Sequence, residues 1–181
     1  AMRDILGGKG AGLAEMANLG LPVPPGFTLS ARLCVTYLEQ GTFPDDLREE
    51  VDRHLKQLER ATKKKFGDAR NPLLVSVRSG AAVSMPGMME TILNLGLNDE
   101  TVNGLIAGSG NPRFAYDSYR RFVQMYGNVV FDLPKEPFEE VLAEAKQRRK
   151  AKRDIDLPVD DLKALAGEFK AIIQSRTGLP F

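Results

Sequence analysis

The sequence predicts an α+β fold in two parts. Residues 1–97 mix helix patterns with short strand patterns, whereas residues 98–181 carry helix patterns only. Hydrophobic residues make up 43% of the 181 residues and charged residues 27%, which is ordinary usage for a globular protein. We therefore expect a small mixed sheet with helices over 1–97, followed by an all-helical subdomain over 98–181 that buries its own core.

Composition also argues against several kinds of partner. The formal net charge of +1 gives no broadly basic surface for nucleic acid. The single cysteine, Cys34, rules out an internal disulfide, and no apolar run is long enough for a signal sequence or a membrane span. We expect a cytoplasmic protein with no nucleic-acid partner and no membrane partner. Cys34 lies between apolar neighbours on a helix pattern, so we expect it to be buried.

The first element is predicted to be a glycine-rich segment, LGGKGAG at 6–12, that leads into a helix over 10–19. Its glycines allow backbone N–H groups to point at an anion, the helix N-terminus adds partial positive charge, and Lys9 adds a full charge. The segment is not a P-loop, since a glycine follows Lys9 where a Ser or Thr would contact magnesium. A tight turn with a solvated lysine is the alternative interpretation.

Three further elements are predicted before the central strand. They are a short strand at 27–29, a helix at 30–40 and a longer helix at 44–64. Ser30 is expected to cap the second of these, and Gly41 to end it. His54 is the only histidine of the chain, and it lies among apolar residues at helical spacing. We expect it to be a structural residue at the surface or boundary of its helix.

A strand over 73–78 is predicted to carry an arginine to the edge of a methionine-rich loop. Alternation places Arg78 on the face that also presents Ser76. The partner strand is expected at 91–97, which makes 79–90 a long connection of the kind that is often functional. Arg78 suits an anion because its planar fork can bind two oxygens and stays charged. The alternative is a hairpin whose methionines fill gaps in the core.

The second part is predicted to be a small helical bundle. Asn111 and Pro112 form a cap and first-turn pair for its main helix. The apolar stripes of the three longest helices are Ala115, Tyr119, Phe122, Tyr126 and Val129; Phe138, Val141, Leu142 and Ala145; and Leu162, Leu165, Ala166, Phe169, Ile172 and Ile173. A basic run at 148–153 follows the second helix, and we interpret it as a solvated helix end.

Four stretches of the sequence resemble the N-terminal region of the pyruvate, phosphate dikinases. They read GGKGAGLAEM at 7–16, GLPVPPGF at 20–27, LVSVRSGAAVSMPGMMETILNLGLND at 74–99 and FAYDSYRRF at 114–122. The resemblance covers essentially the whole chain, and the SMPGMM loop is its most specific feature. Phosphoenolpyruvate synthases share the Gly-Gly-Lys and Arg-Ser features, but their corresponding loop is an acidic and aromatic segment.

The resemblance implies a partial ATP-grasp nucleotide-binding domain that uses ATP and Mg²⁺. The terminal pyrophosphoryl unit of ATP would pass to a histidine on a separate domain, phosphate would take one phosphoryl group, and pyruvate would become phosphoenolpyruvate. Lys9 and Arg78 would be the catalytic residues and would contact the nucleotide phosphates. Further nucleotide contacts would come from the methionine-rich loop: Ser84, Gly87, Met88 and Met89. The magnesium ligands would lie outside this chain.

The resemblance further implies a fragment of a larger, homo-oligomeric enzyme that is inactive by itself. Its partners would be ATP, phosphate and the remaining domains, including the phosphohistidine domain. Ala82 departs from the family, many members of which carry a basic residue at this position. Two alternatives stay open: a fragment of a phosphoenolpyruvate synthase-like dikinase, and a non-catalytic helical interaction module.

Overall fold

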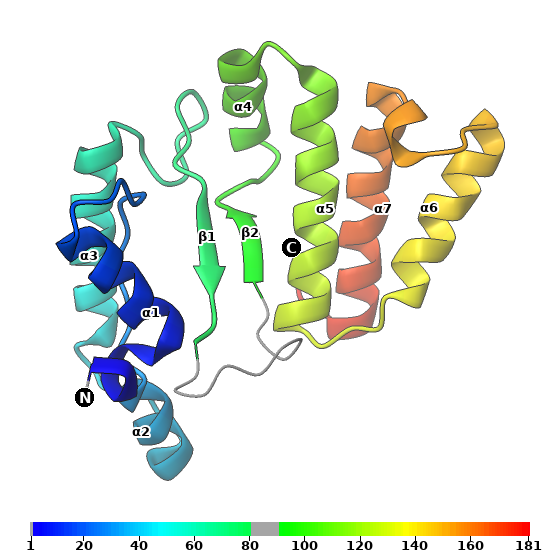
Figure 1. Cartoon of the computed structure of the whole chain (residues 1–181). Helices are drawn as coiled ribbons and strands as arrows, with labels where there is room; N and C mark the ends of the chain where they lie inside the picture. Colours follow the sequence, from blue (N-terminus) through cyan, green and yellow to red (C-terminus); the bar gives the residue numbers. More distant parts are fainter. Residues whose placement is uncertain (1, 81–90) are drawn as a thin grey trace. The chain divides into compact units, whose positions relative to one another are not determined.

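The computed structural model describes residues 2–80 and 91–181, and its elements confirm an α+β fold (Figure 1). In chain order they are α1 Met2–Asn18, α2 Arg32–Gln40, α3 Leu47–Thr62, β1 Val75–Arg78, β2 Thr91–Leu95, α4 Thr101–Ser109, α5 Pro112–Val130, α6 Glu136–Arg149, the 3-10 helix η1 Asp154–Asp156 and α7 Val159–Thr177. Strands β1 and β2 pair as a two-stranded antiparallel sheet. None of the helices in the described ranges is both long and apolar enough to span a bilayer.

The chain divides into two compact units. Unit one comprises Ala1–Lys64 and Arg78–Thr91, and unit two comprises Lys65–Val77 and Ile92–Phe181. The sequence led us to expect a boundary after residue 97 instead. Leu97 is only 3% exposed and belongs to the apolar core formed by the later helices, which explains why the segment before it groups with them. The division into functional subdomains at 1–97 and 98–181 stays a prediction.

Helix α5 is the centre of unit two. It packs against α4 and α7, and α6 packs on the other side of α7 (Figure 1). The predicted stripes supply the core, because burial of apolar surface is the main force that holds such helices together. The buried members of these stripes are Ala115, Tyr119 and Phe122 of α5, Phe138 and Ala145 of α6, and Leu162, Leu165, Ala166, Phe169 and Ile173 of α7. Val123 of α5, which the predicted stripe did not include, is buried as well.

The start of α5 forms as its sequence predicts. The Asn111 side chain accepts a hydrogen bond from the Phe114 backbone N–H at 3.0 Å, and Pro112 occupies the first turn. Both features satisfy or remove backbone donors that a helix N-terminus leaves without partners. The local signal alone was therefore enough to place this helix end.

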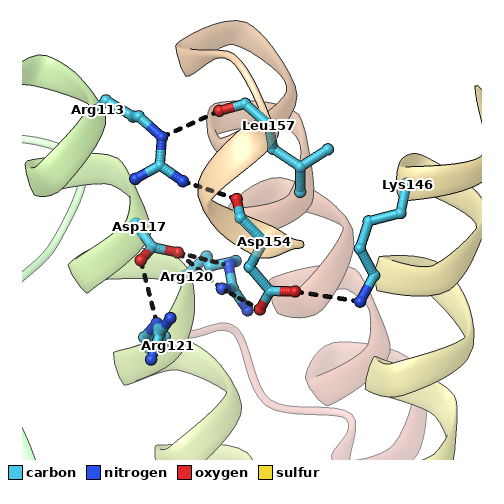
Figure 2. A network of polar contacts seen from close by, with 7 residues as sticks. All are labelled: Arg113, Asp117, Arg120, Arg121, Lys146, Asp154 and Leu157. Carbon is cyan, nitrogen blue, oxygen red and sulfur yellow. Dashed lines mark hydrogen bonds and ion pairs between the residues drawn. The ribbon is translucent and has the colours of Figure 1, made fainter. Parts of the chain in front are cut away.

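A buried arginine on α5 organises a network of polar contacts (Figure 2). The Arg120 side chain is 2% exposed, and it donates to Asp117 on its own helix and to Asp154 in η1, the closest pairs being 2.7 and 2.9 Å. Lys146 of α6 reaches Asp154 at 3.1 Å, and Arg113 donates to the Asp154 and Leu157 backbone carbonyls at 2.6 and 3.1 Å. The network thus ties α5 to the connection between α6 and α7.

A second polar cluster joins the residues after β2 to α5 and α7. Lys170 contacts both carboxylate oxygens of Asp99 at 2.7 Å, and the Tyr119 hydroxyl donates to Asp99 at 3.1 Å. The hydrogen bond from Lys170 is the main reason that the pKa of Asp99 lies below its usual value of 3.8. Burial, followed by the Asp99 charge, raises the pKa of the Tyr119 phenol, so it stays protonated.

Unit one forms its three predicted helices but not its first predicted strand. Residues 27–29 belong to no strand in the described structure, and Cys34 is exposed, so both expectations were wrong. Helix α2 ends as predicted at Gly41, whose left-handed backbone (φ 72°) lets its N–H reach the Tyr37 carbonyl. Ala11 is the one buried apolar side chain of unit one among the described residues. A large share of its apolar surface is therefore left uncovered.

Replacing Arg120 with methionine should destabilise unit two by about 3–5 kcal/mol, because the change leaves the partly buried Asp117 and Asp154 carboxylates without their shared cation. Arg121→Met is the matched control, since Arg121 contacts the same Asp117 from a side chain that is 59% exposed. The control substitution should lower the free energy of unfolding by less than about 1 kcal/mol. Urea denaturation followed by far-ultraviolet circular dichroism measures both. Equal losses in the two variants would contradict this role for Arg120.

Low pH should decrease the stability of unit two, because Asp99 and Asp154 become protonated. Burial raises the pKa of Asp154, but the hydrogen bond from Lys146 and the Arg120 charge outweigh it and lower the pKa below 3.8. A carboxylate whose pKa is lower in the folded state stabilises fully above its unfolded pKa, and this contribution is lost as the pH falls through the folded value. The free energy of unfolding should thus decline below about pH 3.8. The decline should be shallower in Asp99→Asn, and an unchanged slope would contradict the assignment.

Candidate functional site

The candidate site begins at a break in helix α1. Gly7 has φ 68° and ψ 171°, a backbone conformation that only glycine adopts readily, and the chain is helical on both sides of it. We expected a glycine-rich loop over 6–12, but the structure puts Gly8 to Gly12 inside the helix. The single break at Gly7 is enough to start a new helical segment, and Lys9 lies in its first turn.

Lys9 reaches from this helix to the end of strand β1. Its Nζ donates to the Ser79 backbone carbonyl at 3.1 Å, across 70 positions of sequence. Both residues belong to unit one, and Ser79 follows directly after Arg78. The hydrogen bond therefore brings the lysine ammonium to the same end of the strand as the predicted arginine.

Arg78 is the last residue of β1 and is exposed to solvent. No ion pair of its guanidinium is present among residues 2–80 and 91–181. The predicted alternation of β1 does not appear as alternating burial, because Ser76, Val77 and Arg78 are all exposed. A two-stranded sheet offers no third strand to cover this end. Among the described residues, no ion pair competes with a ligand for the Arg78 donors.

The remaining predicted contacts, Ser84, Gly87, Met88 and Met89, and the departure at Ala82 lie outside the described residues. Within the described ranges, no group of three His, Cys, Asp or Glu side chains is placed to hold a metal ion. Two surface hollows are found there, one on α3 and one of about 530 Å³ bordered by α1, α2 and α3. Neither is lined by Lys9 or Arg78.

Sequence analysis did not predict the part played by the Ser79 backbone. A carbonyl acceptor carries no side-chain signal, so no residue type could have announced it. His54 is half-buried as expected, where it contacts the Gln57 side chain at 3.2 Å and stacks on Phe27. Tyr119 and Arg120 of α5 are buried residues with structural contacts.

Comparison with known proteins identifies the class to which this arrangement belongs. Residues 3–58 and 35–152 match the family described as "Pyruvate phosphate dikinase, AMP/ATP-binding domain". The chain belongs to this family. Two of its cations, Lys9 and Arg78, lie at the start of a helical segment and at the end of a strand.

Several similar curated proteins carry the name pyruvate, phosphate dikinase. The chain is 54% identical to pyruvate, phosphate dikinase of Giardia intestinalis and 52% identical to that of Clostridium symbiosum, over 99% and 95% of its own length. It is 54% identical over 99% of its length to pyruvate, phosphate dikinase 1, chloroplastic, of Zea mays. In each comparison the chain spans only about a fifth of the relative, 20%, 20% and 19% respectively.

Substituting Gly7 with alanine should destabilise unit one by on the order of 1–3 kcal/mol, since a side chain at φ 68° and ψ 171° is strained. Gly12→Ala is the matched control in the same helix, because an added Cβ there meets nothing within 4 Å. Alanine in a helix interior should instead stabilise by roughly 0.5–1 kcal/mol. Thermal denaturation of both variants tests the pair, and shifts of the same sign would contradict this account of α1.

Proposed function

We propose that this chain is the part of a pyruvate, phosphate dikinase polypeptide that holds the phosphates of ATP. The whole polypeptide would convert ATP, pyruvate and phosphate into AMP, phosphoenolpyruvate and diphosphate. The observation that carries the proposal is the hydrogen bond from Lys9 to the Ser79 carbonyl, which brings a lysine of α1 beside Arg78. Membership of the AMP/ATP-binding family and the printed names of the relatives support it.

Lys9 and Arg78 have different roles in this proposal. Lys9 is a flexible point charge held by one neutral carbonyl, and it can turn to a phosphate oxygen, which forms a stronger charge-assisted hydrogen bond. Arg78 presents a planar fork of donors at the strand end, suited to two oxygens of the group in transfer. Phosphoryl transfer spreads negative charge over the equatorial oxygens, so fixed cations that meet this charge lower the barrier.

Magnesium would accompany ATP and neutralise phosphate charge when bound. The described residues offer no cluster of carboxylates for it, so we place its ligands outside this chain and derive no step from a metal held here. The contacts proposed for Ser84, Gly87, Met88 and Met89 would close over the phosphates. They rest on the resemblance of the methionine-rich loop alone.

The group that accepts the pyrophosphoryl unit would be a histidine on another domain. His54, the only histidine in the sequence, contacts Gln57, stacks on Phe27 and lies on a different element from Lys9 and Arg78. Phosphate would be the second acceptor. We further propose a homo-oligomer for the whole enzyme and residence in the cytoplasm, although relatives from Zea mays, Oryza sativa and Arabidopsis thaliana are named chloroplastic.

Two alternatives receive less support. A phosphoenolpyruvate synthase-like dikinase would share the Lys9 and Arg78 features, but the relatives carry the pyruvate, phosphate dikinase name. A non-catalytic interaction module would have no reason to bring a lysine to the residue beside an arginine that has no ion pair within the described ranges. The proposed phosphate-binding role explains why Lys9 and Arg78 lie at the same end of β1.

The test uses the whole dikinase polypeptide that contains this sequence. Arg78→Ala should lower the rate of conversion of ATP to AMP about 100-fold or more, with a smaller change in nucleotide affinity, because its donors act mainly on charge that develops in the transition state. Lys9→Ala should lower the rate and weaken nucleotide binding together.

Lys152→Ala is the control for both variants, since it removes an exposed lysine from the basic run of unit two. It should leave turnover unchanged. Wild-type turnover in both Lys9→Ala and Arg78→Ala would show that the two cations do not serve catalysis.

A further inference from the structure

A short stretch of unit one connects two helices without being assigned to a sheet. Residues 26–30 have no helix, strand, turn or bend in the structure. Their sequence, Gly-Phe-Thr-Leu-Ser, alternates apolar and polar side chains as a strand does. The sequence therefore predicts a strand, but no residue in the described ranges pairs with it.

Helices lie against both faces of this stretch. The Thr28 methyl group lies 3.1 Å from the point where a Cβ on Gly10 would sit, so Thr28 faces α1. Phe27 stacks on His54 of α3, with ring centroids 5.6 Å apart. Successive side chains of a straight strand point to opposite faces. Helix α1 therefore covers one face and α3 the other, which is how helices flank a strand in a layered α/β sheet.

The backbone edges of the stretch are free in the part of the chain that the structure describes. No residue of 2–80 or 91–181 makes a backbone hydrogen bond with residues 26–29. The next bonds along the chain run from the Leu33 N–H to the Ser30 carbonyl at 3.0 Å and from the Ala31 N–H to the Ile5 carbonyl at 2.8 Å. Straight backbone with unpaired N–H and C=O groups is a template for pairing with another strand.

Apolar surface accompanies these free edges. Phe27 and Leu29 are 39% and 51% exposed, and the stretch borders the hollow of about 530 Å³. Leu6, Leu33, Leu47 and Val51 supply further apolar lining from the three helices. A neighbouring strand with apolar residues at alternate positions would bury this surface while it satisfies the backbone groups.

We propose that residues 26–29 are a strand of a sheet whose neighbouring strand comes from a segment of the dikinase polypeptide outside these 181 residues. The curated relatives are about five times as long as this chain, which spans 20% of them, so they contain ample sequence to supply it. The inference rests on the proposal that the chain is part of such a polypeptide. It requires nothing of Lys9, Arg78 or ATP.

Hydrogen exchange followed by mass spectrometry tests the proposal without substrates. Amides of residues 27–29 should exchange at nearly unprotected rates in the 181-residue chain and at least about 100-fold more slowly in the whole dikinase polypeptide, because ladder hydrogen bonds must open before exchange. Amides in the buried middle of α5 are the internal control, and their exchange should be similar in both proteins.

Three outcomes would overturn the proposal. Equal exchange of residues 27–29 in the two proteins would show that no strand pairs there. Protection in the dilute 181-residue chain would place the partner within this chain. Protection that rises with the concentration of the 181-residue chain would identify a second copy as the partner.

Variants give a second readout in the whole polypeptide. Thr28→Val keeps the backbone N–H and the shape of the side chain, so protection of residues 27 and 29 should persist. Phe27→Pro and Thr28→Pro each remove one N–H, and successive N–H groups of a strand point to opposite edges. At least one of the two should therefore abolish protection of its neighbours, and retention in both would contradict strand pairing.

Discussion

The buried guanidinium of Arg120 is the interaction on which the rest of unit two depends. A charge that is 2% exposed needs close carboxylate partners, and these hold α5 against the connection between α6 and α7. Helix α5 in turn provides the middle of the apolar core, against which Leu97 and the partly buried Leu74 and Ile92 pack. The parts of β1 and β2 that belong to unit two are therefore supported by helices that follow them in sequence.

Unit one has a different balance of forces. Ala11 is its one buried apolar side chain in the described ranges, whereas Leu19 and Leu38 are more than 70% exposed. Apolar burial supplies most of the stability of a folded domain, so a unit with this little of it gains little stability from a core of its own. Lys9 lies in this unit, and its helix is also bonded to the Ser79 carbonyl, which ties the two segments of the unit together.

Sequence predicted those features that local chemistry determines. The Asn111 cap, the Gly41 helix end and the apolar stripes of α5, α6 and α7 formed, because each depends on residues within a few positions of one another. The strand at 27–29 did not form, since a strand needs a partner that the pattern of one segment cannot specify. The exposure of Cys34 has the same origin, because burial depends on what packs against α2.

The candidate site shows the same limit at the level of single atoms. Glycine-rich composition favoured a loop around Lys9, yet one residue, Gly7, takes the strained conformation and the other glycines continue the helix. Residue types identified Lys9 and Arg78 as cations suited to phosphate. The bond that joins their positions ends on a backbone carbonyl, which any residue at position 79 would offer.

The contrast between Arg78 and Arg120 gives a physical criterion for separating binding cations from structural ones. Arg120 makes several short hydrogen bonds to two carboxylates in a buried place, so any new partner would have to replace bonds that are already satisfied. Arg78 is exposed and has no ion pair in the described part of the chain, and Lys9 gives up only a neutral carbonyl when it turns to an anion. A phosphate group meets little competition at these two side chains, and this difference in existing partners, more than the residue type, makes them the better candidates.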